Sequence, residues 1–252
     1  MLGRKAFYIT ILRFLPFCLV SCHIAKKCSN CGEIILKNRF YNDRTNTYVK
    51  SEAFGEDIPI WYKDDLSIQK IMRLYINIDT NSIETRKLVV DRYTFIDRRT
   101  KSFYHYHSFS DTARFDSVYT LPDSVPIIGW NYYYTHHLPF TEPPKELPDT
   151  TINDLDYKRI KLINTIKIND STTFKRISIC YFRCGIKTMF SLDTRLSEKM
   201  GCPMVWYQSL PNSQDRFPLS MEIEFVANKL NAEELKVFAA WEKNEKLHPV
   251  IK

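Results

Sequence analysis

Apolar and polar residues alternate with a period of two over much of the chain between residues 73 and 226. Successive side chains of a β-strand point to opposite faces, so this alternation predicts antiparallel strands that each bury one face. A polar hairpin at residues 96–101 joins two of the predicted strands. The predicted strands are residues 73–79, 88–96, 102–109, 157–163, 174–182 and 221–226.

A segment near the C-terminus has helical spacing instead. Asn231 is a good N-cap, and two glutamates after it suit the positive end of the helix dipole. An apolar stripe follows at Leu235, Phe238, Ala239 and Trp241. A sheet and a helix that each have one apolar face can bury those faces together. We therefore expect a mainly β (α+β) fold, a curved antiparallel sheet with a C-terminal helix.

Residues 121–150 interrupt the strand pattern. This segment holds six prolines, and proline lacks the N–H that a sheet ladder needs, so it predicts a long loop or an edge excursion. Long aromatic loops in compact proteins are often functional. The aromatic residues that we expect to contact a ligand or partner here are Trp130, Tyr132, Tyr133 and Tyr134.

The N-terminal 22 residues have the features of an export signal. Arg4 and Lys5 form a basic start, and an apolar stretch follows that ends in Leu-Val-Ser-Cys at Cys22. This ending resembles the lipobox of bacterial lipoproteins, in which the cysteine is acylated and becomes the first mature residue. A buried N-terminal segment and a secretory signal without lipid are the alternatives.

The apolar run of the leader is short, because Arg13 interrupts it and leaves only residues 14–20. A run of that length cannot span a bilayer as a helix, so the leader predicts anchoring rather than spanning. We expect residues 1–21 to be a lipoprotein signal peptide and residues 22–45 to be a polar tether that leads into the fold. Residues 46–252 would then form a single antiparallel-sheet domain that contains the loop at 121–150.

The residues after Cys22 lack the acidic run that resembles a surface-export signal in Bacteroidota lipoproteins. We therefore expect a location in the cell envelope facing the periplasm. The formal net charge of the whole chain is +7, but three basic residues lie in the leader and the others are interspersed with acidic ones. That distribution is typical of a solvated surface, and we expect no nucleic-acid partner.

A second motif, Asp-Ser/Thr followed by a small or aliphatic residue, occurs five times. It resembles the O-glycosylation acceptor of exported Bacteroidota proteins. The alternative is ordinary turn chemistry, since Asp, Ser and Thr favour loops. Either interpretation predicts a surface position. The hydroxyl residues concerned are Thr112, Ser117, Ser124, Thr150 and Ser171.

Five cysteines remain after the leader and Cys22 are set aside, and an odd number leaves at least one unpaired in an oxidising compartment. Cys28 and Cys31 have the spacing of a redox motif but lack its flanking residues and its βαβ context. Structural disulfides or free thiols are favoured over zinc binding or redox catalysis, and the sequence leaves the pairing open. The five are Cys28, Cys31, Cys180, Cys184 and Cys202.

Catalytic signatures are missing from the sequence. It contains no Gly-x-Ser-x-Gly, Ser-x-x-Lys or His-Glu-x-x-His motif and no glycine-rich phosphate loop. His105 and His107 share a face of a predicted strand, but no carboxylate or cysteine stands at a supporting spacing. We therefore expect no catalytic residue, metal site or cofactor, and an enzyme or metal protein that uses the two histidines remains the third hypothesis.

The lipobox, the strand run at residues 93–104, and residues 149–153 leading into 157–160 resemble uncharacterised Bacteroidota lipoproteins. Some of those are similar to the LolA/LolB-type half-barrel, in which a curved antiparallel sheet holds an apolar ligand. The late helix departs from that pattern. The resemblance implies a membrane-anchored, non-enzymatic protein that binds an apolar or envelope-derived ligand. The alternative is an interaction module that docks other envelope proteins through the loop at 121–150.

Overall fold

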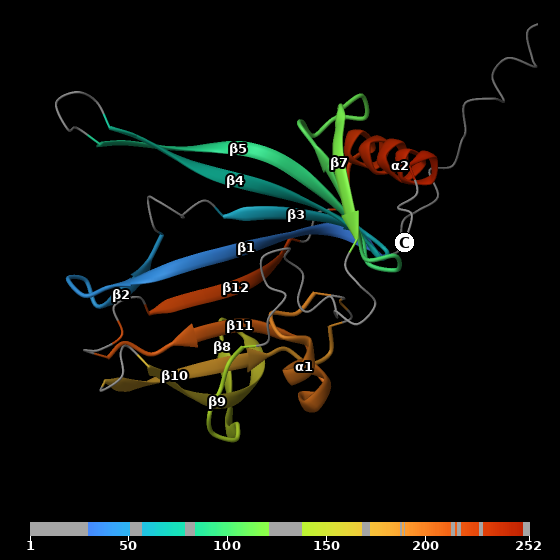
Figure 1. The fold of residues 1–252 in the computed structure, drawn as a ribbon. Coiled ribbons are helices and arrows are strands. Elements are labelled where there is room, and N and C mark those ends of the chain that lie inside the picture. The colour runs from blue at the N-terminus through green and yellow to red at the C-terminus, as the bar shows by residue number, and fades with distance from the viewer. Residues whose placement is uncertain are drawn as a thin grey trace, which may run out of the picture.

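The computed structural model describes residues 30–50, 57–78, 84–120, 138–167, 172–186, 188, 190–212, 215, 218–226 and 229–248. Within these residues the chain forms one open antiparallel sheet of 12 strands (Figure 1). The order across the sheet is β7-β6-β5-β4-β3-β1-β12-β11-β10-β9-β8, and β2 pairs with one end of β1. The strands are β1 (Cys31–Asn42), β2 (Thr47–Val49), β3 (Ile58–Lys63), β4 (Leu66–Ile78), β5 (Glu84–Asp97), β6 (Ser102–Tyr106), β7 (Phe115–Thr120), β8 (Lys145–Ile152), β9 (Leu155–Lys167), β10 (Thr173–Phe182), β11 (Met204–Ser209) and β12 (Leu219–Val226).

The predicted fold class is confirmed. Each predicted strand overlaps an observed one, and the predicted C-terminal helix is α2 (Ala232–Leu247). Asn231 caps α2 in a capping box with Glu234, since each residue's side chain accepts from the other's backbone N–H. A second helix, α1 (Thr194–Met200), was not predicted, because seven residues are too few to show a helical period.

Much of the segment at residues 22–45, expected to be a tether and entry segment, is strand. β1 begins at Cys31 and lies between β3 and β12, with Ile34 and Leu36 fully buried. The basic residues that made this segment look polar point to the other face. There Lys37 lies 2.7 Å from Glu224 and Arg39 lies 2.6 Å from Asp57.

The end of the Pro-rich segment is also a strand. Residues 145–152 form β8, which pairs with β9 and lies at one edge of the sheet. Pro148 is tolerated there because an edge strand has one side on which its backbone N–H is not needed for pairing. Residues 121–137 lie outside the described residues.

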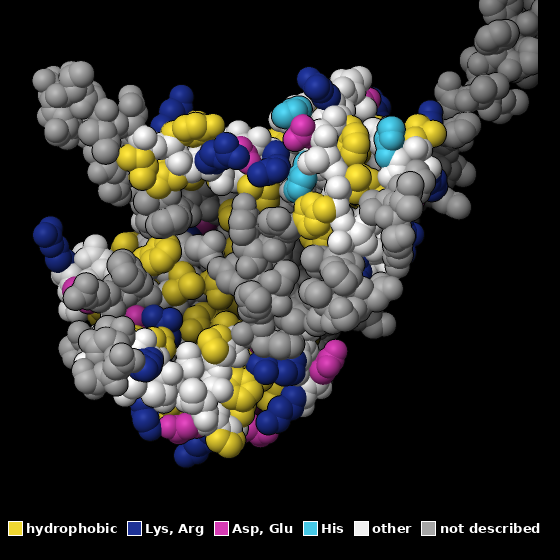
Figure 2. All heavy atoms as spheres, in the orientation of Figure 1, with side chains coloured by type: hydrophobic (Ala, Val, Ile, Leu, Met, Phe, Trp, Pro, Cys, Tyr) yellow, Lys and Arg dark blue, Asp and Glu magenta, His cyan; other side chains and the backbone are white. Residues whose placement is uncertain are grey.

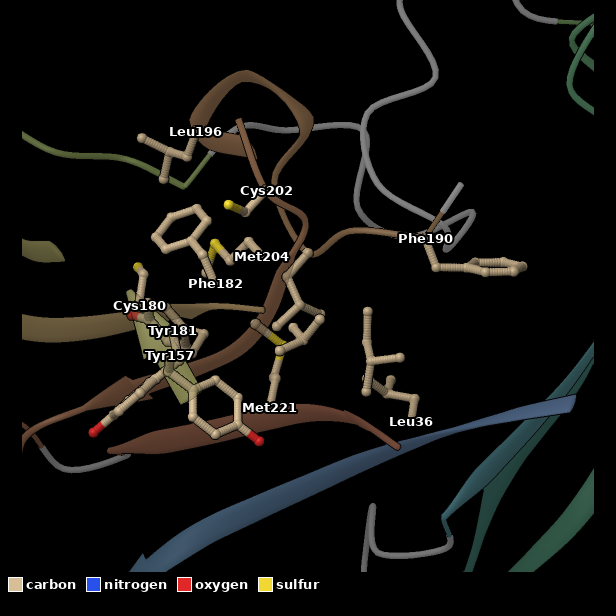
Figure 3. Close-up of a cluster of buried hydrophobic side chains, with 14 of the residues drawn as sticks. Leu36, Tyr157, Cys180, Tyr181, Phe182, Phe190, Leu196, Cys202, Met204 and Met221 are labelled. Carbon is tan, nitrogen blue, oxygen red and sulfur yellow. The ribbon is translucent and has the colours of Figure 1, made fainter. Parts of the chain in front are cut away.

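Two hydrophobic cores lie on opposite faces of the sheet where they meet at β3. Ile60 of β3 belongs to the first core and the next residue, Trp61, packs against the second. Since neighbouring residues in a strand point to opposite faces, the sheet separates the two cores. We call the face of the first core, which α1 covers, the inner face. Figure 3 shows Leu196 of α1, Phe182 of β10 and Met204 of β11 pointing toward one another in this core.

The second core lies between α2 and strands β4 to β6. Val237, Phe238 and Trp241 of the helix are buried against Phe95 and Tyr106 of the sheet. The rings of Trp241 and Tyr106 stack with centroids 3.9 Å apart, and the Trp241 indole N–H donates to the Ser110 carbonyl at 3.0 Å. The predicted packing of the C-terminal helix against the sheet is therefore present, on the face opposite to the one that α1 covers.

A carboxyl pair joins the end of α2 to the sheet. Burial, followed by the hydrogen bond to Asp97 and its charge, raises the pKa of Glu245 to about 7. The carboxyl of Asp97 is buried, which opposes its ionisation, but hydrogen bonds from Arg99 outweigh this and lower its pKa. Protonated Glu245 therefore stabilises the docking of α2, and ionised Glu245 repels Asp97.

We expect the effect of Glu245→Gln on stability to depend on pH. A carboxyl whose pKa rises on folding contributes stability that is complete below its unfolded value of 4.5 and is lost as the pH rises through about 7. Relative to the unmodified chain, the variant should therefore be more stable at about pH 8 than at about pH 5. Urea denaturation at the two pH values measures this difference. Glu233→Gln changes an exposed side chain of the same helix and should show no such difference between the two pH values. The prediction would be contradicted if Glu245→Gln changed the free energy of unfolding equally at both pH values.

Candidate functional site

A cavity of about 160 Å³ lies on the inner face between strands β9 to β12 and residues 138 and 139. Pairing brings its lining together, because Leu162 lies opposite Ser178, Asn164 opposite Arg176, and Tyr207 opposite Met221. Figure 2 shows hydrophobic side chains gathered in a hollow over β1, β12 and β11. The lining residues are Leu138, Pro139, Leu162, Asn164, Arg176, Ser178, Tyr207, Leu219 and Met221.

The polar groups of the cavity are bonded to the protein itself. The Ser178 hydroxyl lies 2.9 Å from the Tyr207 hydroxyl. Arg176 forms a two-pronged ion pair with Asp215, at 2.6 and 2.7 Å, and the Asp215 side chain is only 1% exposed. This hydrogen bond raises the pKa of Arg176, and burial raises the pKa of Tyr207. The guanidinium charge is balanced, so the cavity presents a neutral, mainly apolar lining.

A short segment at residues 138–141 crosses the cavity, and α1 holds it in place. The Leu138 backbone N–H donates to Asp193 at 2.9 Å, and Arg195 donates to the Leu138 carbonyl at 3.1 Å. The Arg195 guanidinium also lies 4.6 Å from the centre of the Phe140 ring. Asp193 is the N-cap of α1, so one carboxylate both starts the helix and fixes the segment.

Two cysteines tie α1 to the sheet. Cys184 follows β10, Cys202 follows the helix, and the two form a disulfide. Cys180 is buried on the inner face, where burial raises the pKa of its thiol well above the usual value. Cys31 is half-buried in β1, and Cys28 lies outside the described residues. The structure therefore assigns one of the pairings that the sequence left open.

A wider surface groove of about 500 Å³ lies on the other side of the same segment. It runs between residues 140–144 and helix α1, and the basic side chains of Arg195 and Lys199 line one wall. Arg195 is already engaged with the segment, and Glu142 of the opposite wall lies 2.7 Å from Lys175. This groove is open to solvent along its length, so we place the candidate site in the smaller, apolar cavity.

The predicted contact residues Trp130, Tyr132, Tyr133 and Tyr134 lie outside the described residues, as do Cys22, Ser124 and Ser171. Their roles stay predictions. Of the other predicted glycosylation sites, Thr112 lies in an exposed turn, Ser117 is exposed on edge strand β7, and Thr150 is half-buried on edge strand β8.

His105 and His107 do not form a common site. His105 is buried in β6, where its Nδ1 lies 3.1 Å from the Thr94 hydroxyl, and burial and the nearby Arg92 lower its pKa. His107 lies beyond the end of β6 and its Nε2 is 3.6 Å from Asp116. Within the part of the chain that the structure describes, no three His, Cys, Asp or Glu side chains form a metal-binding group.

The sequence did not reveal the residues that line the cavity. The alternation at residues 157–163 and 174–182 does place Leu162 on one face of its strand and Ser178 on one face of the next. It contains no signal that Tyr207 and Met221 would join them, or that Asp215 would balance Arg176 across 39 residues. Only the strand order brings these groups together.

Comparisons with known proteins give a weak structural likeness. No family model and no curated protein matches the chain. The solved structure of LprF from Mycobacterium bovis is similar, with 6% sequence identity and a TM-score of 0.32 over 80% of this chain and 88% of that chain. Among the described helices, neither is long and apolar enough to cross a membrane.

Proposed function

We propose that this chain is an envelope lipoprotein, anchored through Cys22, that binds a neutral apolar ligand in the inner-face cavity without reacting with it. The observation that carries the proposal is the cavity itself, with a mainly apolar lining and one balanced charge. Pockets of this kind, mostly apolar with a few placed polar groups, are typical of small-molecule binding.

The size of the cavity limits what it holds. Pockets that bury a whole drug-sized ligand run to roughly 300–1,000 Å³, whereas this cavity has about 160 Å³. It therefore takes one apolar end of a ligand, such as the end of an acyl chain or a single ring. Since Asp215 already neutralises Arg176, the ligand gains little from a carboxylate of its own.

The disulfide between Cys184 and Cys202 supports a location in an oxidising compartment. Disulfides persist in oxidising compartments such as the periplasm and are rare in the cytosol. The Cys184–Cys202 pair is therefore what we expect of a chain that is exported by the leader at residues 1–21.

Replacing Asn164 with tryptophan should block the cavity. Asn164 is half-buried in its lining, so an indole there fills the space without displacing a core residue. We expect binding of the neutral fluorescent probe N-phenyl-1-naphthylamine to weaken by about tenfold or more, which corresponds to about 1.4 kcal/mol. Hexadecanol should displace the probe at least as well as hexadecanoate, because the cavity has no unbalanced cation.

The matched control is Ile163→Trp. Ile163 is the preceding residue of β9, equally half-buried, and points to the opposite face. It should leave the affinity for the probe unchanged. Equal losses from both variants, or no binding by the unmodified chain, would contradict the cavity proposal.

The anchor has its own test. Replacing Cys22 with serine removes the thiol that the lipid would be attached to. We expect cells grown with labelled palmitate to incorporate label into the unmodified protein and none into the Cys22→Ser variant, which should leave the membrane fraction. Lipidation at this residue would be contradicted if the Cys22→Ser variant incorporated label. It would also be contradicted if the unmodified protein stayed in the membrane fraction without incorporating label.

A further inference from the structure

The wall of the inner-face cavity has two unlike parts. All of its lining residues except Leu138 and Pro139 lie in strands β9 to β12. Antiparallel ladders join those strands, so their side chains keep their places unless several backbone hydrogen bonds break. Leu138 and Pro139 belong to residues 138–140, which we call the strap. Pro139 is exposed, so the strap is a single layer of chain between the cavity and solvent.

Two side chains at the start of α1 hold the strap. Asp193 accepts from the Leu138 backbone N–H at 2.9 Å, and Arg195 donates to the Leu138 carbonyl at 3.1 Å. The Arg195 guanidinium also lies 4.6 Å from the centre of the Phe140 ring. Pro139 lies between Leu138 and Phe140 and has no N–H with which to bond to the sheet. We call Asp193 and Arg195 the clamp, because the closed position of the strap depends on them.

The helix that carries the clamp is itself fixed. Leu196 of α1 is buried and packs with Phe182 and Met204 in the first core (Figure 3). The disulfide between Cys184 and Cys202 ties the chain directly after the helix to the residues that follow β10. Since α1 is held in these ways, the part that moves when the cavity opens is the strap.

The far end of the strap is attached to β9, and this attachment can act as a hinge. The Thr141 backbone N–H donates to the Ile163 carbonyl at 2.9 Å, and the Thr141 hydroxyl accepts from the Thr165 backbone N–H at 3.0 Å. Outside the strap lies the groove of about 500 Å³, which is open to solvent. The strap therefore has room to swing outward from Thr141 once the clamp releases Leu138.

We propose that the strap is the gate through which a ligand enters and leaves the cavity, and that the clamp keeps this gate closed. The inference rests on the proposed binding of an apolar ligand in the cavity. Opening elsewhere would part paired strands, whereas opening at the strap releases only the two hydrogen bonds of Leu138 and the ring contact of Phe140. The groove outside the strap is then the route by which the ligand approaches.

A gate changes the rates of binding rather than the affinity. A weaker clamp raises the population of the open form equally in the free and the ligand-bound chain, so entry and release both accelerate and their ratio stays the same. A residue that touches the ligand changes mainly the rate of release. Measuring both rates therefore distinguishes the two roles.

Replacing Arg195 with alanine removes one half of the clamp. Stopped-flow fluorescence measures the association of N-phenyl-1-naphthylamine with the purified protein and its release into excess hexadecanol. We expect both rates to rise about tenfold, because a hydrogen bond from a charged group is lost, and the Kd to change by less than about twofold. Lys199→Ala is the matched control, since Lys199 is an exposed residue one turn farther along α1 and its loss removes the same charge. It should leave both rates unchanged.

A second measurement needs no ligand. The Leu138 amide is protected from hydrogen exchange while it donates to Asp193, and each opening of the gate exposes it. NMR of the isotope-labelled protein should show this amide exchanging about tenfold faster in Arg195→Ala than in the unmodified chain. In Lys199→Ala its exchange should be as slow as in the unmodified chain.

Faster exchange at Leu138 together with faster association and release of the probe supports the gate. An unchanged Leu138 amide, or a faster one with unchanged probe kinetics, would overturn it. A rise in the release rate alone would also overturn it, because Arg195 would then act as part of the binding wall. If the unmodified chain bound no probe, the cavity proposal would fail and the gate with it, whereas normal binding with unchanged rates in Arg195→Ala would overturn the gate alone.

Discussion

Replacing Trp241 with alanine is expected to lower the free energy of unfolding by about 3–5 kcal/mol, as for other large aromatic side chains removed from a core. Trp241 is fully buried and stacks on Tyr106, and its ring also meets Phe95 edge-on at 6.2 Å between centroids. The variant also deprives the Ser110 carbonyl of its donor. Since this side chain joins α2 to the sheet, its loss weakens the docking of the whole helix.

Urea denaturation followed by circular dichroism measures this loss. The control is Leu247→Ala in the same helix, where the side chain is 63% exposed, and we expect its effect to stay within about 0.5 kcal/mol. A loss below about 1 kcal/mol for Trp241→Ala would mean that α2 does not hold the second core together.

Replacing Arg176 with methionine should cost a similar amount, about 3–5 kcal/mol, because it leaves a buried carboxylate without its partner. The Asp215 side chain is 1% exposed, so water cannot replace the two hydrogen bonds from the guanidinium. Adding Asp215→Asn removes the carboxylate charge that Arg176→Met leaves unbalanced. The double variant should therefore recover most of the stability that the single variant loses.

The control for this pair is Lys175→Met. Lys175 lies 2.7 Å from Glu142, but both side chains are well exposed, and such surface pairs contribute about 0–1 kcal/mol. Urea denaturation at neutral pH compares the three variants with the unmodified chain. If the double variant were as unstable as Arg176→Met alone, the loss would come from packing rather than from an unpaired charge.

Local patterns were enough to predict six of the twelve strands and the last helix. The run at residues 88–96 falls within β5, and the hairpin at 96–101 joins β5 to β6. Asn231 begins α2 as predicted, since a cap depends on residues only three positions apart. Periodicity and capping act within a few residues, so a single sequence records them directly.

Elements that depend on distant partners were missed. β1 looked polar because Lys37 and Arg39 stand next to its apolar residues, and their partners Glu224 and Asp57 are far along the chain or across a loop. Helix α1 is short, and it depends on the Asp193 cap and on the disulfide that follows its last turn. Neither contribution can be read from an apolar period.

The sequence by itself determined that this protein is mainly a sheet of alternating strands with one capped C-terminal helix. The tertiary structure decided which faces are covered. It set which residues join each of the two cores and made the inner-face cavity. The reason is that alternation marks a face as apolar but carries no information about what lies against it. That depends on pairings such as Ile34 with Phe225, which join residues from opposite ends of the chain.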